Sequence, residues 1–411
     1  MRGQDHCQDK KGFLRTITRY PILHLMKYQF GFILEQTLGH VTHSRNLRAT
    51  VSRHPEIEAY WGLPAWDGND RLGKVPLVGS NWTIQSGLSA RRALKAMRRK
   101  SRLDALFFHT QVTAVLLPDW LQRIPSIVSL DATPRQYDEL GEAYAHSTGP
   151  LWLERWKWRL NRDCFRHARH LVTWSEWTRQ GLVDEYQVPP EKITVLPPGV
   201  DTQAWACPAS RTPNRVVKIL FVGGDLDRKG GRLLLEAFLH LKEALTTLRQ
   251  HLPVQGNREG EPELELHLVT RTPVDPQPGV FVYSGLEPNS EHLKSLFFKS
   301  DLFCLPTLGD CLPMALSEAG AAGLPAISTR MAAIPEIVQD GKTGFLVPSG
   351  DLEALTAALQ RLILDPDLRL RLGHAAGQFV RHRFDAGRNV NRLIELMKQI
   401  SAGSREEKFP H

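Results

Sequence analysis

The sequence predicts an α/β protein made of two Rossmann-like domains, each built on a parallel sheet. Its 411 residues are too many for one ordinary domain and suit two domains of about 200 residues each. Short apolar segments rich in β-branched residues alternate with amphipathic segments along the chain. This alternation is typical of strand–helix–strand units in a parallel sheet. Hydrophobic residues make up 42% and charged residues 23% of the chain, as in globular domains.

The expected elements fall into two groups. In the first half, strands are predicted at residues 30–35, 105–109, 126–130, 170–174 and 193–196, and helices at 41–53, 88–100 and 151–167. In the second half, strands are predicted at 216–222, 264–270, 280–284, 301–306, 325–329 and 345–347, and helices at 232–248, 313–322, 352–364 and 389–400.

The halves separate at Pro197, Pro198 and Gly199. Two prolines cannot continue a central strand or a helix, so the chain must turn there. We therefore expect an N-terminal domain over residues 1–200, of which 1–28 form an arm. A C-terminal domain is expected over 201–385, followed by a helix with a tail over 386–411.

Cysteine usage and the apolar runs favour a cytoplasmic location. The five cysteines are scattered without a CxxC pair, as expected of reduced thiols and not of a disulfide frame or a zinc site. No run of 18 apolar residues occurs, so a membrane span is not expected. Basic residues interrupt every apolar run in the first 30 residues, which argues against a secretory signal peptide.

Positive charge is concentrated in the first half of the chain. Residues 1–200 contain 28 Lys and Arg against 19 Asp and Glu, whereas the remaining residues contain 24 against 25. A one-sided basic domain favours an anionic partner such as a membrane surface or an acidic glycan.

A glycine-rich turn after a buried strand is the first chemical signal. Residues 223–231 read GGDLDRKGG and lie between the strand at 216–222 and the helix that follows. Glycines let the backbone approach a phosphate, and a helix N-terminus presents free N–H groups. Arg228 and Lys229 stand where they would neutralise a diphosphate. The spacing is neither GxGxxG nor the P-loop pattern, and the alternative is an ordinary turn with surface charges.

Two acidic residues after a later strand are the second signal. Asp310 ends the loop after the strand at 301–306, and Glu318 stands about two turns into the next helix. A carboxylate in that helix suits a ribose diol, because each oxygen accepts from a hydroxyl, and Asp310 suits the sugar. Alternatively, Asp310 caps the helix and Glu318 is a surface residue.

The two motifs, in this order and about 90 residues apart, resemble the group 1 (family 4) retaining glycosyltransferases of the GT-B fold. Residues 310–327 (DCLPMALSEAGAAGLPAI) resemble the family pattern EGLPMxLLEAMAxGxPVI. Residues 334–347 (IPEIVQDGKTGFLV) resemble IPEIVxDGxTGFLV, and residues 193–201 (ITVLPPGVD) resemble VIPPGVD. The similarity is dense from about residue 165 to 400 and weaker from about 30 to 165. The resemblance implies two Rossmann-like domains that face each other across a cleft. Residues 1–200 would be the acceptor-side domain and 201–385 the donor-binding domain, and the helix in 386–411 would pack back on the N-terminal domain.

The resemblance also implies site residues, with a UDP- or GDP-sugar as substrate and no cofactor. Lys229 matches the lysine that contacts the donor diphosphate, and Glu318 the glutamate that binds the nucleotide ribose. Asp310 and His109 match residues near the transferred sugar. The remaining donor contacts are the segment of Leu312, Pro313, Met314 and Ala315, and Gly39 in the glycine loop that faces the donor from the N-terminal domain.

The donor loop departs from the family pattern at one position and the acidic motif at another. Gly224 stands where the family usually has arginine, and Arg228 is expected to substitute for it. Asp310 stands where the family usually has glutamate. Preorganised charge aimed at a leaving group is usually the largest catalytic contribution. We assign it to Lys229, Arg228 and the helix N-terminus at 313–315, so no metal is expected to be required.

A basic helix is predicted in the first domain. Residues 88–102 carry seven basic side chains and no acid. Such a helix suits an anionic bilayer, and a solvated helix packed on the sheet is the alternative. The candidate membrane-facing residues are Arg91, Arg92, Lys95, Arg98 and Arg99.

Tryptophans in the helix at 151–167 allow two interpretations. The helix carries Trp152, Trp156 and Trp158 together with Arg155, Lys157 and Arg159, as at a membrane interface. The i, i+4 spacing of Trp152, Trp156 and Leu160 favours packing in the core. No recognised nucleic-acid module accompanies the positive charge, so a nucleic-acid partner is not expected.

An active glycosyltransferase is thus the favoured function, with an unidentified acceptor among cell-envelope lipids or polysaccharides. It would act in the cytoplasm or peripherally on the inner face of the membrane. A non-catalytic relative that binds sugar nucleotides is the second hypothesis. A GT-B phosphorylase or an NAD-dependent oxidoreductase is the third.

Overall fold

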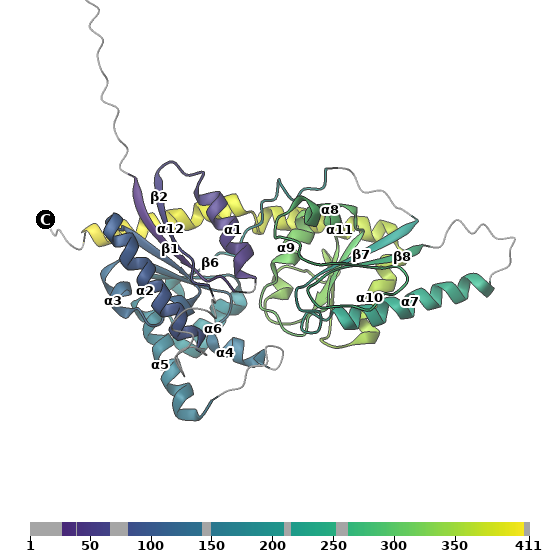
Figure 1. Cartoon of the computed structure of the whole chain (residues 1–411), viewed down its shortest axis with the longest axis horizontal. Coiled ribbons are helices and arrows are strands. Elements are labelled where there is room, and N and C mark those ends of the chain that lie inside the picture. The colour runs from purple at the N-terminus through teal and green to yellow at the C-terminus, as the bar shows by residue number, and fades with distance from the viewer. Residues whose placement is uncertain are drawn as a thin grey trace, which may run out of the picture.

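The computed structural model describes residues 27–37, 39–65, 81–141, 149–208, 215–251 and 262–406. Over these residues the chain forms two lobes, each with a six-stranded sheet (Figure 1). The strand orders are β2-β1-β3-β4-β5-β6 and β12-β11-β10-β7-β8-β9, and all pairings are parallel. The predicted fold class is confirmed.

The first sheet contains one strand that the sequence analysis missed. Its strands are β1 (Tyr28–Leu34), β2 (Ile57–Gly62), β3 (Ala105–His109), β4 (Ser126–Leu130), β5 (His170–Thr173) and β6 (Ile193–Val195). The missed strand, β2, lies at the edge of the sheet, where only its first and last residues are buried. An edge strand needs no long apolar run, so its pattern was weak. Tyr28 already belongs to β1, and the rest of the predicted arm, apart from Lys27, lies outside the described residues.

The α-helices that the first half of the chain contributes to this lobe, in the described residues, are α1 (His40–Val51), α2 (Trp82–Lys100), α3 (Pro118–Arg123), α4 (Pro134–Glu139), α5 (Leu151–His167) and α6 (Glu176–Tyr186). Three short ones, α3, α4 and α6, were not predicted. Their signals lie at their first residues. α3 begins with a proline and has no side-chain cap, Thr133 and Gln136 form a capping box at α4, and the Ser175 side chain accepts from Thr178 N at α6.

The second sheet is built from the strands predicted for it. They are β7 (Val216–Val222), β8 (Glu263–Val269), β9 (Val280–Tyr283), β10 (Leu302–Leu305), β11 (Ala326–Thr329) and β12 (Gly344–Val347). Its helices are α7 (Gly231–His251), α8 (Glu291–Lys299), α9 (Met314–Ala321), α10 (Leu352–Leu364) and α11 (Pro366–Arg383). The sequence analysis missed α8 and α11. Two glycines weaken the helical pattern of α11, yet they let it lie close against α9.

The last helix, α12 (Ala386–Glu406), leaves the second lobe and packs on the first (Figure 1). It is longer than the predicted 389–400. Its apolar face shares one buried cluster with strands of the first sheet, including Phe30, Phe32 and Phe107. The α12 residues in that cluster are Val390, Leu393, Ile394 and Met397.

The chain crosses between the lobes twice, near residue 200 and near residue 385, and the two crossing segments run side by side. Val200 N donates to Phe384 O at 2.9 Å, and Ala386 N donates to Val200 O at 3.0 Å. A Cβ atom on Gly199 would stand 2.1 Å from Ala386 Cα, so only glycine permits this approach. The predicted break at 197–199 is thus the place where both crossings pair, while the boundaries at 200 and 385 stay predictions.

Replacing Gly199 with alanine should force the two crossings apart. We expect Gly199→Ala to lose about 1–3 kcal/mol of unfolding free energy, the usual cost of overpacking. Gly387→Ala is the matched control, because a Cβ there would meet only the Asp385 carboxylate, at 3.3 Å. Thermal and urea unfolding of both variants measure the effect, and equal stabilities would contradict it.

Candidate active site

A cavity of about 1860 Å³ lies between the lobes. Loops that follow β1, β3, β4, β7, β8, β9 and β10 line it, so it sits at the carboxyl ends of both parallel sheets, where α/β proteins bind ligands. Among the predicted site residues, His109 and the basic residues of α2 do not line it. The predicted residues that do are Gly39, Gly224, Arg228, Lys229, Asp310, Leu312, Pro313, Met314, Ala315 and Glu318.

The glycine-rich turn after β7 holds its shape through local contacts. Asp225 Oδ1 accepts from Arg228 N at 3.1 Å, and Asp227 forms an ion pair with Arg232. Gly230 has φ +72°, and a Cβ atom there would stand 1.9 Å from Pro306 O. No other residue fits that position without strain. The two aspartates are therefore turn residues, and the turn delivers Arg228 and Lys229 to the cavity.

Asp310 is the counter-ion of both cations. Lys229 Nζ donates to Asp310 Oδ2, and Arg228 Nη1 lies 3.9 Å from Asp310 Oδ1. Arg228 Nη1 also donates to Gly309 O at 2.6 Å. Asp310 does not cap a helix, because α9 begins at Met314 after Pro313. That alternative for Asp310 is wrong, and its carboxylate orients the two side chains that would meet a phosphate.

The N-terminus of α9 opens onto the cavity beside these cations. Its N-cap residue is Pro313, no side chain caps it, and its first turn contains no acidic residue. Leu312, Met314 and Ala315 line the cavity there. Free N–H groups and the positive end of the helix dipole make such an end suited to an anion.

Glu318 lies deeper in the same helix as an isolated carboxyl group. It is 5% exposed, so the alternative of a surface residue is wrong. Its side chain has no hydrogen bond or ion pair with any residue that the structure describes. Burial raises its pKa to about 7. Because a buried carboxylate without donors is unfavourable, a ligand that offers two hydroxyl groups would satisfy it.

His40 is the histidine that forms the cavity wall of the first lobe. Its Nε2 lies 3.2 Å from Asp131 Oδ2, and its Nδ1 lies 3.8 Å from Glu35 Oε2. Burial lowers the pKa of His40, but the attraction of Asp131 and Glu35 outweighs burial and raises it to about 9. His40 therefore carries a positive charge at neutral pH. Its place at the start of a helix after the first strand was the sequence signal for it.

His109 lies behind His40 and is fully buried. Its ring stacks on Trp174 with a centroid distance of 4.8 Å, and the edges of His40 and His43 meet it at the same distance. Burial and the two neighbouring histidines hold the pKa of His109 well below its usual value. Its Nε2 has no hydrogen-bond partner among the described residues. The predicted role of His109 at the sugar thus stays a prediction, and His40 stands nearer the cavity.

The candidate membrane residues lie on two helices of the first lobe. Arg91 of α2 is held by Asp119 through two hydrogen bonds of 3.0 and 2.8 Å, whereas Arg92, Lys95, Arg98 and Arg99 are exposed. In α5, Trp152 is 71% and Trp156 53% exposed. The core-packing prediction was therefore wrong for these two tryptophans. It was right for Leu160, which packs with Trp158 against the buried cluster of the first lobe.

Two facing parallel sheets, with the cavity at their carboxyl ends, form the GT-B architecture. The chain matches the family model "Glycosyltransferase Family 4" over residues 43–204 and "Glycosyl transferases group 1" over 216–365. It therefore belongs to the group 1 (family 4) glycosyltransferases with the GT-B fold.

Known proteins similar to the chain include a curated relative and two solved structures. The putative colanic acid biosynthesis glycosyltransferase WcaL of Salmonella typhimurium is 33% identical over 185 residues, 44% of each chain. Sucrose-phosphate synthase from Thermosynechococcus elongatus superposes with a TM-score of 0.68 at 16% identity, covering 92% of this chain and 100% of that one. Anabaena HepE in complex with UDP-glucose superposes with a TM-score of 0.61 at 15% identity, covering 90% of this chain and 99% of that one. The chain spans about half the length of the curated relatives it matches.

Replacing Glu318 with glutamine should stabilise the free protein at pH 8. The folded-state pKa of about 7 exceeds the ordinary value of 4.5, so the destabilising effect of Glu318 grows as pH rises from 4.5 and is complete above 7. We expect Glu318→Gln to gain roughly 3 kcal/mol at pH 8 and to melt several degrees higher. The gain should be small at pH 4.5.

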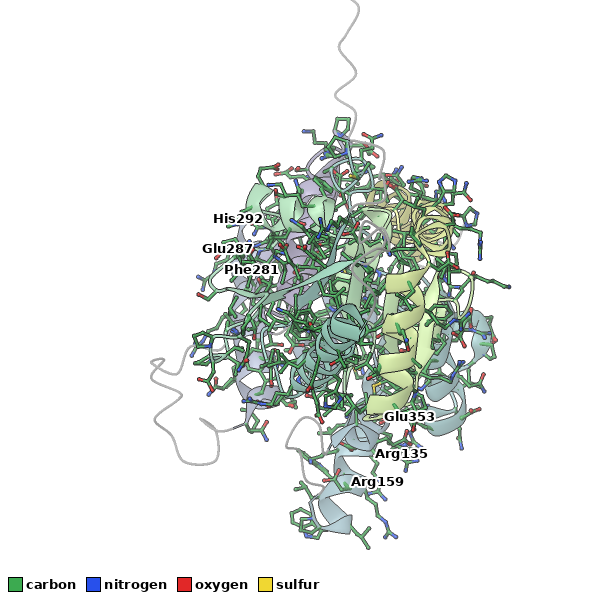
Figure 2. The ribbon with its side chains drawn as sticks, turned by 90° about the vertical axis from the view of Figure 1, so that its right-hand side faces the viewer. Arg135, Arg159, Phe281, Glu287, His292 and Glu353 are labelled. Carbon is green, nitrogen blue, oxygen red and sulfur yellow. The ribbon has the colours of Figure 1, made fainter. Side chains whose placement is uncertain are left out.

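Differential scanning fluorimetry at both pH values measures this gain. Glu353→Gln, at the exposed carboxylate on α10 that Figure 2 labels, is the control and should change neither melting temperature. Identical melting curves for Glu318→Gln and the wild type at pH 8 would contradict the buried, ionised state of Glu318.

Proposed function

We propose that the chain is a retaining glycosyltransferase that moves a sugar from a UDP- or GDP-sugar to an acceptor. The observation that carries the proposal is the unpartnered Glu318 carboxyl, buried on the same cavity wall as the cations Lys229 and Arg228. A nucleoside diphosphate offers a ribose diol to the Glu318 carboxyl and phosphates to the two cations. The cavity continues across to the first lobe, where a sugar and an acceptor would lie.

In the proposed reaction the bond between the anomeric carbon and the diphosphate oxygen breaks. The acceptor oxygen bonds to that carbon on the same face, and its proton passes to the leaving diphosphate. Negative charge then develops on the leaving diphosphate. Lys229, Arg228 and the N-terminus of α9 stabilise it without reorganisation. Asp310 keeps these cations in place, and the positive charge of His40 lies on the cavity wall formed by the first lobe. The charge neutralisation is assigned to these groups and needs no metal ion.

The comparisons support the donor class and favour a cell-envelope acceptor. The Anabaena HepE structure contains UDP-glucose, which supports a UDP-sugar as the donor here. The Salmonella relative is named for colanic acid biosynthesis, which favours a polysaccharide or a lipid-linked glycan. The second candidate, a non-catalytic sugar-nucleotide-binding protein, has the replacement of arginine by Gly224 and of glutamate by Asp310 in its favour.

Nucleotide binding and turnover together test the proposal. We expect UDP- or GDP-sugars and the matching free diphosphate to raise the melting temperature, while NAD does not. Lys229→Ala should keep the fold and lower turnover by about 100-fold or more, as when one transition-state donor is removed, and EDTA should not change wild-type turnover. Nucleotide binding without transfer or donor hydrolysis would favour the second candidate. No stabilisation by any nucleotide would overturn both.

We further propose that the first lobe rests peripherally on the inner face of the cytoplasmic membrane. No helix in the described residues is both long and apolar enough to cross a bilayer. The support comes from α5, whose first turns expose Leu151, Trp152 and Trp156 beside Arg155 and Arg159. The helix projects from the first lobe (Figure 1), and Arg159 lies at that end (Figure 2). Residues of α5 also line the cavity, so this surface leads to the proposed acceptor site.

Vesicle binding tests the membrane surface. Trp152→Ser combined with Trp156→Ser should weaken binding to phosphatidylglycerol vesicles by about tenfold or more, because each buried indole contributes on the order of 2 kcal/mol. Leu364→Ser, at a 53% exposed site on α10 of the other lobe, is the matched control. Co-sedimentation with phosphatidylglycerol and phosphatidylcholine vesicles measures both. A wild-type protein that does not co-sediment with phosphatidylglycerol vesicles would contradict the membrane contact.

A further inference from the structure

The loop after β8 brings an arginine to the position that Gly224 leaves empty. Strands β7 and β8 are neighbours, and Val222 pairs with Val269 at their carboxyl ends. Gly224 and Arg271 each stand two residues beyond this pair, so the parallel register places them side by side. The Arg271 N–H donates to Gly224 O at 3.2 Å, which fixes the two loops to each other.

The Arg271 side chain lies over Gly224. A Cβ atom on Gly224 would stand 3.0 Å from both Nε and Nη2 of Arg271, closer than side-chain atoms usually approach. The φ angle of Gly224 lies outside the left-handed region, so its backbone does not require glycine. The absence of a side chain at 224 therefore provides space, and the guanidinium occupies it.

Arg271 is a cation of the cavity wall without a counter-ion in the described part of the chain. It lines the cavity and is exposed, and its guanidinium has no hydrogen bond or ion pair there. Arg228, by contrast, is held by Gly309 O and lies near Asp310. Lys229 and Arg228 share the charge of Asp310, and Arg228 Nε also lies 3.8 Å from Asp225 Oδ2. Two carboxylates therefore compensate these two cations, and a diphosphate needs a further cation, which Arg271 supplies.

We propose that Arg271 binds the donor diphosphate and replaces, from the neighbouring strand, the arginine that the family carries at position 224. This inference rests on the proposed function. It reassigns to Arg271 the substitution that the sequence analysis gave to Arg228. Strand β7 lies between β8 and β10, so Arg271, in the loop after β8, would approach the diphosphate from the side opposite Asp310, away from that carboxylate. The arginine can therefore stand at position 224 or at position 271, provided that the other position is glycine.

Exchange of the pair tests the inference. Arg271→Ala should weaken binding of the diphosphate that stabilises the wild type by about 10- to 100-fold, the effect of one charged hydrogen bond. The nucleoside monophosphate should lose less affinity. Turnover should fall and the donor KM rise. Arg271→Gln, which keeps the length and removes the charge, should behave like Arg271→Ala, and Arg271→Lys should recover part of the affinity.

Gly224→Arg alone should impair binding, because the new side chain meets Arg271. Combined with Arg271→Gly it should restore diphosphate affinity to within about tenfold of the wild type. Arg330→Ala is the control, since Arg330 is an exposed arginine of the same lobe that pairs with Asp340 and does not line the cavity. Isothermal titration calorimetry with UDP or GDP and the matching monophosphate measures all variants.

The outcomes separate this inference from the proposed function. Wild-type diphosphate affinity in both Arg271→Ala and Arg271→Gln would overturn the inference and leave the proposed function standing. Failure of the double exchange to improve on Gly224→Arg would also overturn it, because the two positions would then not act as a pair. A wild type that binds no nucleoside diphosphate would overturn both.

Discussion

The close approach of Gly199 to Ala386 is the constraint on which the rest of the structure depends. The chain crosses between the lobes twice, and the crossings are hydrogen-bonded to each other at Val200. Because α12 follows directly and buries its apolar face in the first lobe, the second crossing is anchored at both ends. Further ties span the cleft: the Glu336 carboxylate accepts from the N–H groups of Glu176 and Trp177 at the start of α6. Together they hold two sheets with their carboxyl ends facing one cavity.

The cavity concentrates polar groups whose partners are missing from the described chain. Glu318 lacks hydrogen-bond donors, and Arg271 lacks a counter-ion. The buried carboxyl of Glu318 makes the protein less stable than a hydrogen-bonded group would, whereas the exposed guanidinium of Arg271 is solvated. A ligand that supplies a diol and a diphosphate would pair both groups. Such pairing is the physical reason to place binding at this cavity.

Most of the sheet framework could be predicted from the sequence, because buried parallel strands are continuous apolar runs. The edge strand β2 and the short helices α3, α4 and α6 were missed because their signals lie in few residues. For the site, motif spacing located Lys229, Asp310 and Glu318. It could not locate Arg271, whose place beside Gly224 depends on the register of β7 against β8. The spacing of Trp152 and Trp156 defines one helix face, but it does not say whether anything covers that face.

The charge distribution separates two tasks of the chain. The cations of the candidate donor site, Lys229, Arg228 and Arg271, come from the second half, whose basic and acidic residues nearly balance, 24 against 25. The excess positive charge belongs to the first half, on exposed positions of α2 and α5. Donor binding therefore does not account for that excess. Positive charge beside exposed tryptophans, on the lobe that faces the donor site, is what an anionic surface would neutralise, and this is the physical basis for the proposed membrane contact.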